Sequence, residues 1–232
     1  MIKTKAIVLN RKPYRDYDAL VSFYTLDQGY LVLLARGLQK EKSKLAGHLE
    51  PFNLVDLMII KGRERYYIGS AISENSFLNI KSDYQRIWLA GEAINFVQSL
   101  SFPEQVDYNI FLTLRDFLLS LDFSSDSAKE LLLFFKLKVL EILGYGLGSS
   151  SCSFCHSKDD LIFNFFDKEF ICRNCAQGQG LSNEYLFKIS RKSLNLRDNI
   201  INSEFLALQK LSLESNEYQD LETLVNLFKR II

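Results

Sequence analysis

The chain has 232 residues, 47% of them hydrophobic, and its 28 Lys and Arg balance its 28 Asp and Glu, so the formal net charge is zero. This composition excludes intrinsic disorder, which needs fewer apolar residues or a large net charge. It also excludes collagen-like and linker sequences, which need far more than 11 Gly and 3 Pro. No uninterrupted apolar run approaches the roughly 18 residues of a membrane span.

The chain is expected to be cytoplasmic and free of a membrane anchor. Residues 1–5 lead directly into a strand-like pattern, without the basic region, apolar stretch and cleavage site of a signal peptide.

Zero net charge argues against a nucleic-acid partner only if the charges are evenly spread. They are not: residues 1–80 carry 12 Lys and Arg against 8 Asp and Glu, a net of +4, and residues 81–232 carry 16 against 20, a net of −4. Within the first part, residues 36–44 hold four positive charges and one negative charge. The positive charge is therefore concentrated in one short segment.

Residues 3–80 have the pattern of short β-strands rich in β-branched and aromatic residues, separated by polar turns. The expected strands are 5–10, 19–25, 30–35, 52–60 and 65–72. Five short strands favour a small closed barrel of the OB type, because closure removes the exposed edges of a flat sheet. An SH3-like barrel is the competing topology.

From about residue 80 the periodicity becomes helical. Ser82 and Gln85 form a capping-box pattern that opens a helix, and Phe102-Pro103 ends it. The other expected helices are 108–121, 127–143, 183–192, 203–213 and 217–232. The run 131–135 is apolar nearly all round, which favours a helix buried in a bundle.

The four cysteines are the most specific motif. Cys152 and Cys155 form one C-x-x-C pair, and Cys172 and Cys175 form a second pair 16 residues later. This spacing is typical of a four-thiolate zinc site, with residues 161–171 as the intervening hairpin. Two disulfides are the alternative, which a reducing cytosol disfavours, and redox-active or metal-free thiols are another.

Four cysteine ligands would fill the zinc tetrahedron, so the predicted zinc is structural and leaves no position for a substrate. A swap in which His156 replaces one cysteine is conceivable, but an exposed loop histidine is the favoured interpretation.

Catalytic motifs are absent from the sequence. There is no G-x-S-x-G or H-E-x-x-H motif, and His48 and His156 are the only histidines. Residues 37–43 lack the second glycine and the Gly-Lys-Ser/Thr ending of a phosphate-binding loop. We therefore expect a protein that is not an enzyme and uses no nucleotide.

An OB barrel binds single strands by combining a positive groove with aromatic rings on which bases stack. The candidate cations are Lys3, Lys5, Arg11, Lys12, Arg15, Arg36, Lys40, Lys42, Lys44, Arg63 and Arg65. The candidate rings are Tyr14, Tyr17, Tyr24, Tyr30, Tyr66 and Tyr67. For any single tyrosine, packing in the core or rim is the favoured alternative, and a charged run is often only a solvated loop.

Several short motifs occur in a distinctive order along almost the whole chain. They are Tyr14-Arg15-Asp16-Tyr17-Asp18, residues 23–29, Ala35-Arg36-Gly37, Lys42-Ser43, residues 49–52 and Leu143-Gly144-Tyr145, followed by the four cysteines. In this order the sequence resembles the bacterial DNA repair and recombination mediator family RecO.

The resemblance implies an α+β architecture. Its parts would be an OB-fold domain over residues 1–78, a helical domain over 79–149, a zinc-binding knuckle insertion over 150–180, and the C-terminal part of the helical domain over 181–232. The cofactor implied is one structural Zn²⁺ ion, held by Cys152, Cys155, Cys172 and Cys175.

The resemblance also implies partners and binding residues. Proteins of this family bind single- and double-stranded DNA, anneal complementary strands, contact the acidic tail of single-strand-binding protein, and act with RecR to load RecA. The family's DNA-binding face points to Arg15, Arg36, Lys40, Lys42 and Lys44, and we add Arg63 and Arg65 from the basic residues above. Lys136 and Lys138 are candidates for the tail site, with a solvated helix face as the alternative.

The sequence departs from the family pattern in three places. His156 stands where a glycine usually follows the second cysteine, and Lys168 and Glu169 replace glycines often found before the third. Leu38-Gln39 follows Arg36-Gly37, where the family usually has more positive charge. The first two departures leave the turn geometry of the hairpin open.

Two other functions compete with a recombination mediator. One is a zinc-ribbon OB-fold adaptor that binds RNA or protein in transcription or translation. The other is a zinc-dependent hydrolase, which would need an open metal site. Strand-annealing assays separate the adaptor from the mediator, because an adaptor should not accelerate annealing, whereas strands held by their phosphates keep their base edges free to pair.

Overall fold

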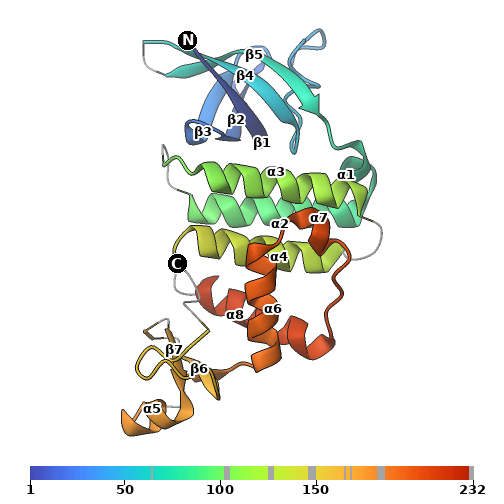
Figure 1. The fold of residues 1–232 in the computed structure, drawn as a ribbon. Helices are drawn as coiled ribbons and strands as arrows, with labels where there is room; N and C mark the ends of the chain where they lie inside the picture. The colour runs from blue at the N-terminus through green and yellow to red at the C-terminus, as the bar shows by residue number, and fades with distance from the viewer. Residues whose placement is uncertain are drawn as a thin grey trace. The chain divides into compact units, whose positions relative to one another are not determined.

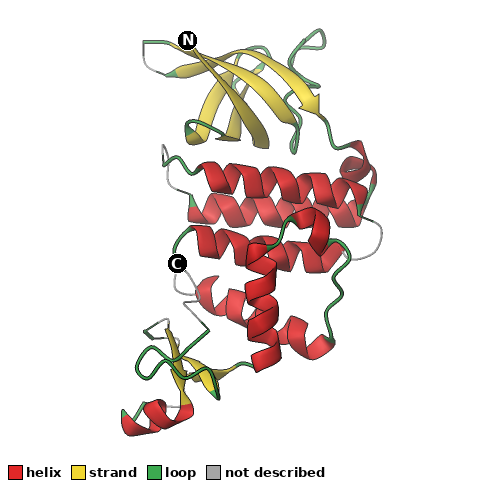
Figure 2. Ribbon diagram, in the orientation of Figure 1, coloured by secondary structure: helices red, strands yellow, loops and turns green. Residues whose placement is uncertain are grey.

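The structure is a computed structural model that describes residues 1–63, 65–101, 105–124, 128–145, 150–164, 166–167, 169–181 and 186–229. The chain divides into two compact units, Met1–Ala128 and Lys129–Ile232. Figure 1 traces the chain and Figure 2 shows that the first unit combines strands with helices, while the second is mostly helical with a small sheet.

Five strands form a closed barrel at the start of the first unit. They are β1 (Ile2–Tyr14), β2 (Asp18–Thr25), β3 (Gly29–Ala35), β4 (Leu54–Lys61) and β5 (Tyr66–Asn75). Their order around the barrel is β1-β2-β3-β5-β4, and the β3–β5 pair is parallel. The predicted five-stranded OB-type barrel is thus confirmed.

The barrel closes around a core of alternating inward residues such as Val21, Phe23 and Leu57. Gly29, which opens β3, has a φ of +64°. A Cβ atom built on it would lie 2.1 Å from the backbone oxygen of Gln105, so the close approach of this segment requires glycine.

Three helices complete the first unit: α1 (Leu78–Ser82), α2 (Tyr84–Leu100) and α3 (Tyr108–Phe123). The predicted capping residue of α2 is wrong by one position. Asp83, not Ser82, caps α2, because its carboxylate accepts a hydrogen bond from the backbone N–H of Arg86 at 3.1 Å. Ser82 ends α1 instead, and the predicted stop at Phe102-Pro103 lies outside the described residues.

The second unit contains the remaining elements. They are most of α4 (Ala128–Ile142), then β6 (Leu161–Asn164), β7 (Glu169–Cys172), α5 (Arg173–Gly178), β8 (Leu186–Lys188), α6 (Arg191–Asn202), α7 (Phe205–Leu208) and α8 (Ser215–Lys229). Residues 131–135 of α4 are all buried, as their apolar pattern predicts. The predicted β6–β7 hairpin is present, and its residues Phe165 and Lys168 lie outside the described part of the chain.

Two helix predictions in the second unit are wrong. Residues 186–188 of the helix expected over 183–192 form β8, which pairs with β6 in a three-stranded sheet ordered β7-β6-β8; its beginning, 183–185, lies outside the described residues. In place of the helix expected over 203–213, the structure has only the short α7, and the longer helix α6 precedes it. At residues 186–188, pairing with β6 overrides the helical pattern of the sequence.

No helix among the described residues is both long enough and apolar enough to cross a membrane.

Candidate nucleic-acid interface and metal centre

Three segments that are far apart in the sequence meet at one end of the barrel. They are the β1–β2 turn, the segment that follows β3, and the β4–β5 turn. We call this region the basic end and define it by Arg15, Arg36, Lys40 and Arg65 together with Tyr14, Tyr17 and Tyr67.

Each cation of the basic end lies over a tyrosine ring. The Arg36 guanidinium carbon is 4.1 Å from the centroid of Tyr67, and the Lys40 ammonium is 5.6 Å from that of Tyr17. Tyr14 has two arginine neighbours, with guanidinium carbons 5.2 Å (Arg15) and 5.9 Å (Arg65) from its centroid. Such contacts are attractive and hold long cationic side chains in defined positions.

Tyr14 also accepts a hydrogen bond from the Arg65 guanidinium, with an N–O distance of 3.4 Å. This bond, and the positive charge of Arg15, lower the pKa of the Tyr14 phenol. The lowered pKa of Tyr14 reflects the excess of positive charge at the basic end.

Asp18 fastens the β1–β2 turn to the segment after β3. Its carboxylate accepts a hydrogen bond from the backbone N–H of Gly37 at 2.8 Å, and Gln39 donates its N–H to the carbonyl of Tyr17 at 2.9 Å. Gly37 has a φ of +64°, which favours glycine. The position of Arg36 and Lys40 thus depends on an acidic residue that charge counting gave no reason to select.

Leu38 explains one departure from the family pattern. Its side chain is buried in the barrel core together with Leu49. An apolar residue at this position anchors the basic segment to the barrel, which a further lysine would not do.

The other predicted DNA-binding residues are placed differently. Lys42, Lys44 and Arg63 are exposed, and no contact joins them to the basic end within the described residues. Lys5, one of the wider set of basic residues, forms ion pairs with Asp56 and Glu74, which neutralise it.

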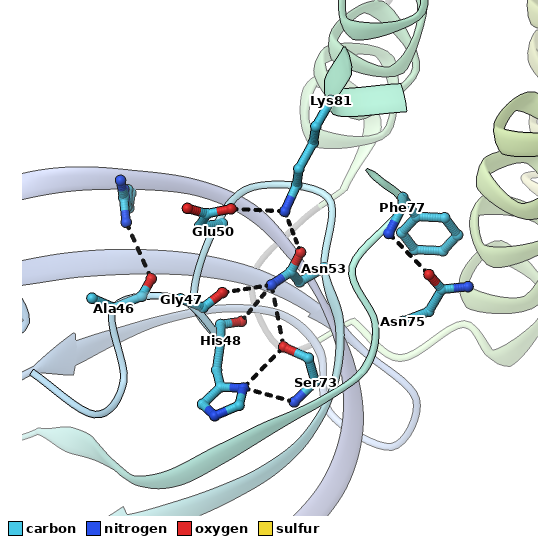
Figure 3. Close-up of polar contacts among 10 residues, drawn as sticks. Ala46, Gly47, His48, Glu50, Asn53, Ser73, Asn75, Phe77 and Lys81 are labelled. Carbon is cyan, nitrogen blue, oxygen red and sulfur yellow. Dashed lines mark hydrogen bonds and ion pairs between the residues drawn. The ribbon is translucent and has the colours of Figure 1, made fainter. Parts of the chain in front are cut away.

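Asn53 secures the far end of the segment that carries the basic residues (Figure 3). The side chain is fully buried, and its amide nitrogen donates to the carbonyls of Gly47 and His48 at 2.9 and 3.0 Å. It also lies 3.2 Å from the hydroxyl of Ser73 on β5. We call this arrangement the Asn53 clamp.

The clamp extends to helix α1 and to the His48 ring. Lys81 of α1 donates to the amide oxygen of Asn53 at 2.5 Å and to the Glu50 carboxylate at 2.9 Å (Figure 3). The ring Nδ1 of His48 accepts the backbone N–H of Ser73 at 3.1 Å. Sequence analysis missed Asn53, which lies within the expected strand 52–60; its burial and its hydrogen-bond partners are visible only in the structure.

The four cysteines form a second candidate site. The Sγ atoms of Cys152, Cys155, Cys172 and Cys175 all lie within 4.8 Å of one another. Cys155 Sγ and Cys172 Sγ are 3.6 Å apart, well beyond the roughly 2.05 Å of a disulfide bond. Four sulfurs on a zinc ion with Zn–S bonds of about 2.3 Å would be separated by about 3.8 Å. The cluster is therefore consistent with a metal site.

The electrostatics of the cluster also fit a cation. Burial opposes ionisation of Cys152, but backbone N–H groups of Cys155, Cys172 and Phe154 outweigh it and lower the pKa of the thiol to about 6. Hydrogen bonding to the Cys172 and Cys155 sulfurs raises the pKa of Cys175 to about 12. Four thiolates cannot coexist at this separation without a positive charge between them.

The turn after the second cysteine explains another departure. His156 has a φ of +59°, the left-handed region that favours glycine, and histidine is one of the residues that tolerate it. Its N–H donates to the carbonyl of Cys152 at 2.9 Å. Among the described residues, the metal-binding group consists of the four cysteines without His156.

The cysteine hairpin is packed onto the helices of its own unit. Phe163 lies 5.2 Å from Phe170 and 5.3 Å from Phe228 of α8, measured between ring centroids. Arg197 of α6, only 2% exposed, places its guanidinium 5.3 Å from the Phe170 centroid and donates to the Ser150 hydroxyl at 2.8 Å. Sequence analysis missed Arg197. Its position three residues after the buried Leu194 places both on the same face of α6, and this spacing is the one signal in the sequence that Arg197 is buried.

Two models of one protein family match nearly the whole chain. Residues 1–77 match the family model "Recombination protein O N terminal" and residues 81–230 match "Recombination protein O C terminal".

Individual relatives agree with these matches. The chain is 31% identical over 179 residues to the DNA repair protein RecO of Syntrophus aciditrophicus, covering 75% of this chain and 69% of the relative. It is 25% identical over 223 residues to the DNA repair protein RecO of Alkaliphilus metalliredigens, covering 95% and 89%. The protein of the same name from Clostridium perfringens is 24% identical over 202 residues, covering 86% and 80%.

Proposed function

Because the chain belongs to the RecO family of non-enzymatic DNA repair and recombination mediators, we propose that it binds single- and double-stranded DNA through the basic end of its barrel and anneals complementary strands. The observation that carries this proposal is the convergence of Arg15, Arg36, Lys40 and Arg65 at one end of an OB barrel, each over a tyrosine ring.

The stacked arginines favour phosphate contact over base stacking at these rings. A guanidinium that covers a tyrosine face must be displaced before a base can stack there, while its outward N–H groups remain available to phosphate. Stacking also fixes the rotamers of the arginines before DNA arrives, which reduces the entropy lost on binding. The exposed Lys42, Lys44 and Arg63 would extend the contact along the strand.

Phosphate contact supplies the mechanism of annealing. Contact with phosphates does not depend on the base sequence, and it leaves the base edges free to pair with a second strand. About four to six contacts to a single strand predict a slope of log affinity against log salt of about −3 to −4. The reaction needs no nucleotide hydrolysis.

We propose further that Cys152, Cys155, Cys172 and Cys175 hold one structural zinc ion. Their sulfur-only ligand set, and the mutual approach of the four Sγ atoms to within 4.8 Å, support this assignment. When bound, the ion would hold the two cysteine turns together and neutralise the thiolates. In this proposal residues 1–78 bind DNA, 150–180 form the zinc knuckle, and 79–149 with 181–232 form the helical domain.

RecR, RecA loading and the acidic tail of single-strand-binding protein are proposed partners on the basis of family membership. Lys138 is a poor candidate for the tail site. Its half-buried ammonium donates to the carbonyl of Ile201 at 2.7 Å and lies 5.7 Å from the Phe205 ring centroid. Burial also lowers its pKa, because removal from water disfavours the charged ammonium.

The test is charge reversal at the basic end. R36E/K40E should lower affinity for a labelled single strand about tenfold at moderate salt and flatten the salt slope by about 1.4, the value of two lost phosphate contacts. A matched control is K129E/K210E, which makes the same charge change at two exposed lysines of the second unit. If the two variants bind DNA with equal affinity, the basic end is not part of the DNA-binding surface and the proposal is wrong.

Annealing assays with and without single-strand-binding protein test the alternative adaptor function. A mediator accelerates pairing of complementary strands in both conditions. An adaptor that binds only RNA or protein leaves the rate unchanged, and R36E/K40E would then have no effect on it.

A further inference from the structure

A groove crosses the cysteine-bearing part of the second unit. It consists of two adjoining depressions with volumes of about 410 and 150 Å³, both lined by Ile162 of β6, Arg173 of α5 and Lys188 of β8. We call it the hairpin groove. All of its lining residues belong to the second unit, and none belongs to the barrel.

The hairpin groove is strongly positive. Lys158, Arg173, Lys188 and Arg191 line it, and Asp160 is the one carboxylate among its described lining residues. This excess stands out because residues 81–232 carry 16 basic against 20 acidic residues. The four cations are therefore concentrated here within a region that is acidic as a whole.

These cations are not neutralised by ion pairs within the described part of the chain. Lys192, the next residue after Arg191, shows the contrast, because its ammonium lies 2.9 Å from carboxylates of both Glu214 and Glu217. Arg191 is committed to the wall of the groove, since it donates to the backbone carbonyls of Lys158 and Ser150. Arg173 and Lys188 remain as cations shared by both depressions.

Apolar and positively charged side chains line the groove together. The larger depression is lined by Ile162, Ala176, Leu181 and Leu186 with Arg173, Gln177 and Lys188. This mixture suits a single nucleic-acid strand, whose base faces are apolar and whose phosphates carry the charge. A small anion alone would leave the apolar side chains uncovered.

We propose that the hairpin groove is a second nucleic-acid contact surface, at which Arg173 and Lys188 bind phosphates of a DNA single strand. This inference rests on the proposed function and deepens it. The barrel holds one strand in the proposed function, and a second contact surface on the other compact unit would let the same chain also bind a complementary strand.

The cysteine cluster would then have a role in DNA binding without touching DNA. Arg173 directly follows Cys172, and its backbone N–H donates to the carbonyl of Asp160 at 3.1 Å. The fold of the cysteine turns thus sets the position of one phosphate-binding cation.

The experiment measures anisotropy of a labelled oligo-dT strand over a range of salt for the full chain. R173E/K188E should lower affinity about tenfold and flatten the salt slope by about 1.4, because two phosphate contacts are lost. K129E/K210E is again the control with the same charge change. R173Q/K188Q removes the same contacts without repulsion, and it decides the question if R173E/K188E has lost metal or unfolds at a lower temperature.

The outcomes separate this inference from the proposed function. If R36E/K40E weakens binding and the groove variants match K129E/K210E, the hairpin groove inference is wrong while the barrel proposal stands. If the wild-type chain binds no DNA, both are wrong. If the groove variants keep DNA affinity but lose binding of a labelled poly-glutamate peptide, the groove takes an acidic protein segment and the inference is overturned.

Discussion

The two candidate sites are assembled in different ways. The cations of the basic end come from three turns between Arg15 and Arg65, whereas the four cysteines all lie between positions 152 and 175. The basic end is held by many weak contacts, such as cation–π pairs and the bond from Gly37 to Asp18. The cysteine cluster would be held by the strong bonds of four sulfurs to one zinc ion.

This difference teaches where each site is vulnerable. Removal of one ligand from a metal cluster abolishes the site, because structural zinc supplies much of the folding free energy of its module. Loss of one contact at the basic end should reduce function in proportion, because the remaining contacts persist. Three substitutions sharpen this contrast.

The largest effect is expected for Cys172→Ser. Structural zinc contributes about 10–16 kcal/mol of apparent binding free energy, most of which a three-ligand site would lose. We expect zinc per chain to fall from one to near zero, and hydrogen exchange over residues 150–181 to become fast while the barrel stays protected. Native mass spectrometry and hydrogen exchange measure these outcomes.

His156→Gly is the matched control for this substitution, since His156 lies beside Cys155 but outside the cluster, and glycine accepts its φ of +59°. It should retain one zinc. Loss of zinc in H156G, or a wild-type chain with four free thiols and no metal, would contradict the four-cysteine assignment.

A smaller effect is expected for Asn53→Ala in the barrel unit. The substitution removes the fully buried amide of Asn53, leaving the carbonyls of Gly47 and His48 without their donor and Lys81 without one of its acceptors, so stability should fall by about 2–3 kcal/mol. Urea unfolding and hydrogen exchange over residues 45–55 measure the loss. Asn95→Ala on the exposed face of α2 is the control and should change stability by less than about 0.5 kcal/mol.

The smallest effect is expected for Asp18→Ala, and its sign is informative. Removal of a negative charge beside Arg36 should strengthen DNA binding if only charge matters. We expect the opposite, a threefold or so weaker affinity and a loss of about 1 kcal/mol of stability, because the bond to Gly37 is lost. Asp18→Asn keeps an acceptor and should bind at least as well as the wild type, and tighter binding by D18A would refute the positioning role.

The fold was predictable where local pattern and tertiary contacts agree. Short runs of β-branched and aromatic residues between polar turns identified all five barrel strands, and the apolar run 131–135 identified α4. Prediction failed over residues 186–188, which have a helical pattern but complete a sheet beside β6. It also misplaced the cap of α2, because Ser82 and Asp83 are equally good capping residues and only the backbone at the α1–α2 junction selects Asp83.

The candidate sites were predictable to different degrees. The spacing of the cysteines predicted a cluster that the structure confirms, since short C-x-x-C turns fix most of its geometry locally. The DNA-binding residues stay predictions. Arg197 and the Asn53 clamp escaped notice because their role depends on partners far away in sequence.

The sequence by itself determined which parts this protein has. They are a barrel of five strands, a buried helix, four cysteines spaced to bring their sulfurs together, and an excess of cations over residues 36–44. These properties follow from periodicity and spacing, which are local. Only the tertiary structure decided which cations share a surface. Leu38 and Asn53 are buried within the segment between β3 and β4, and Arg197 is buried beside the cysteine hairpin. The cations of the basic end and of the hairpin groove become neighbours only in the folded chain.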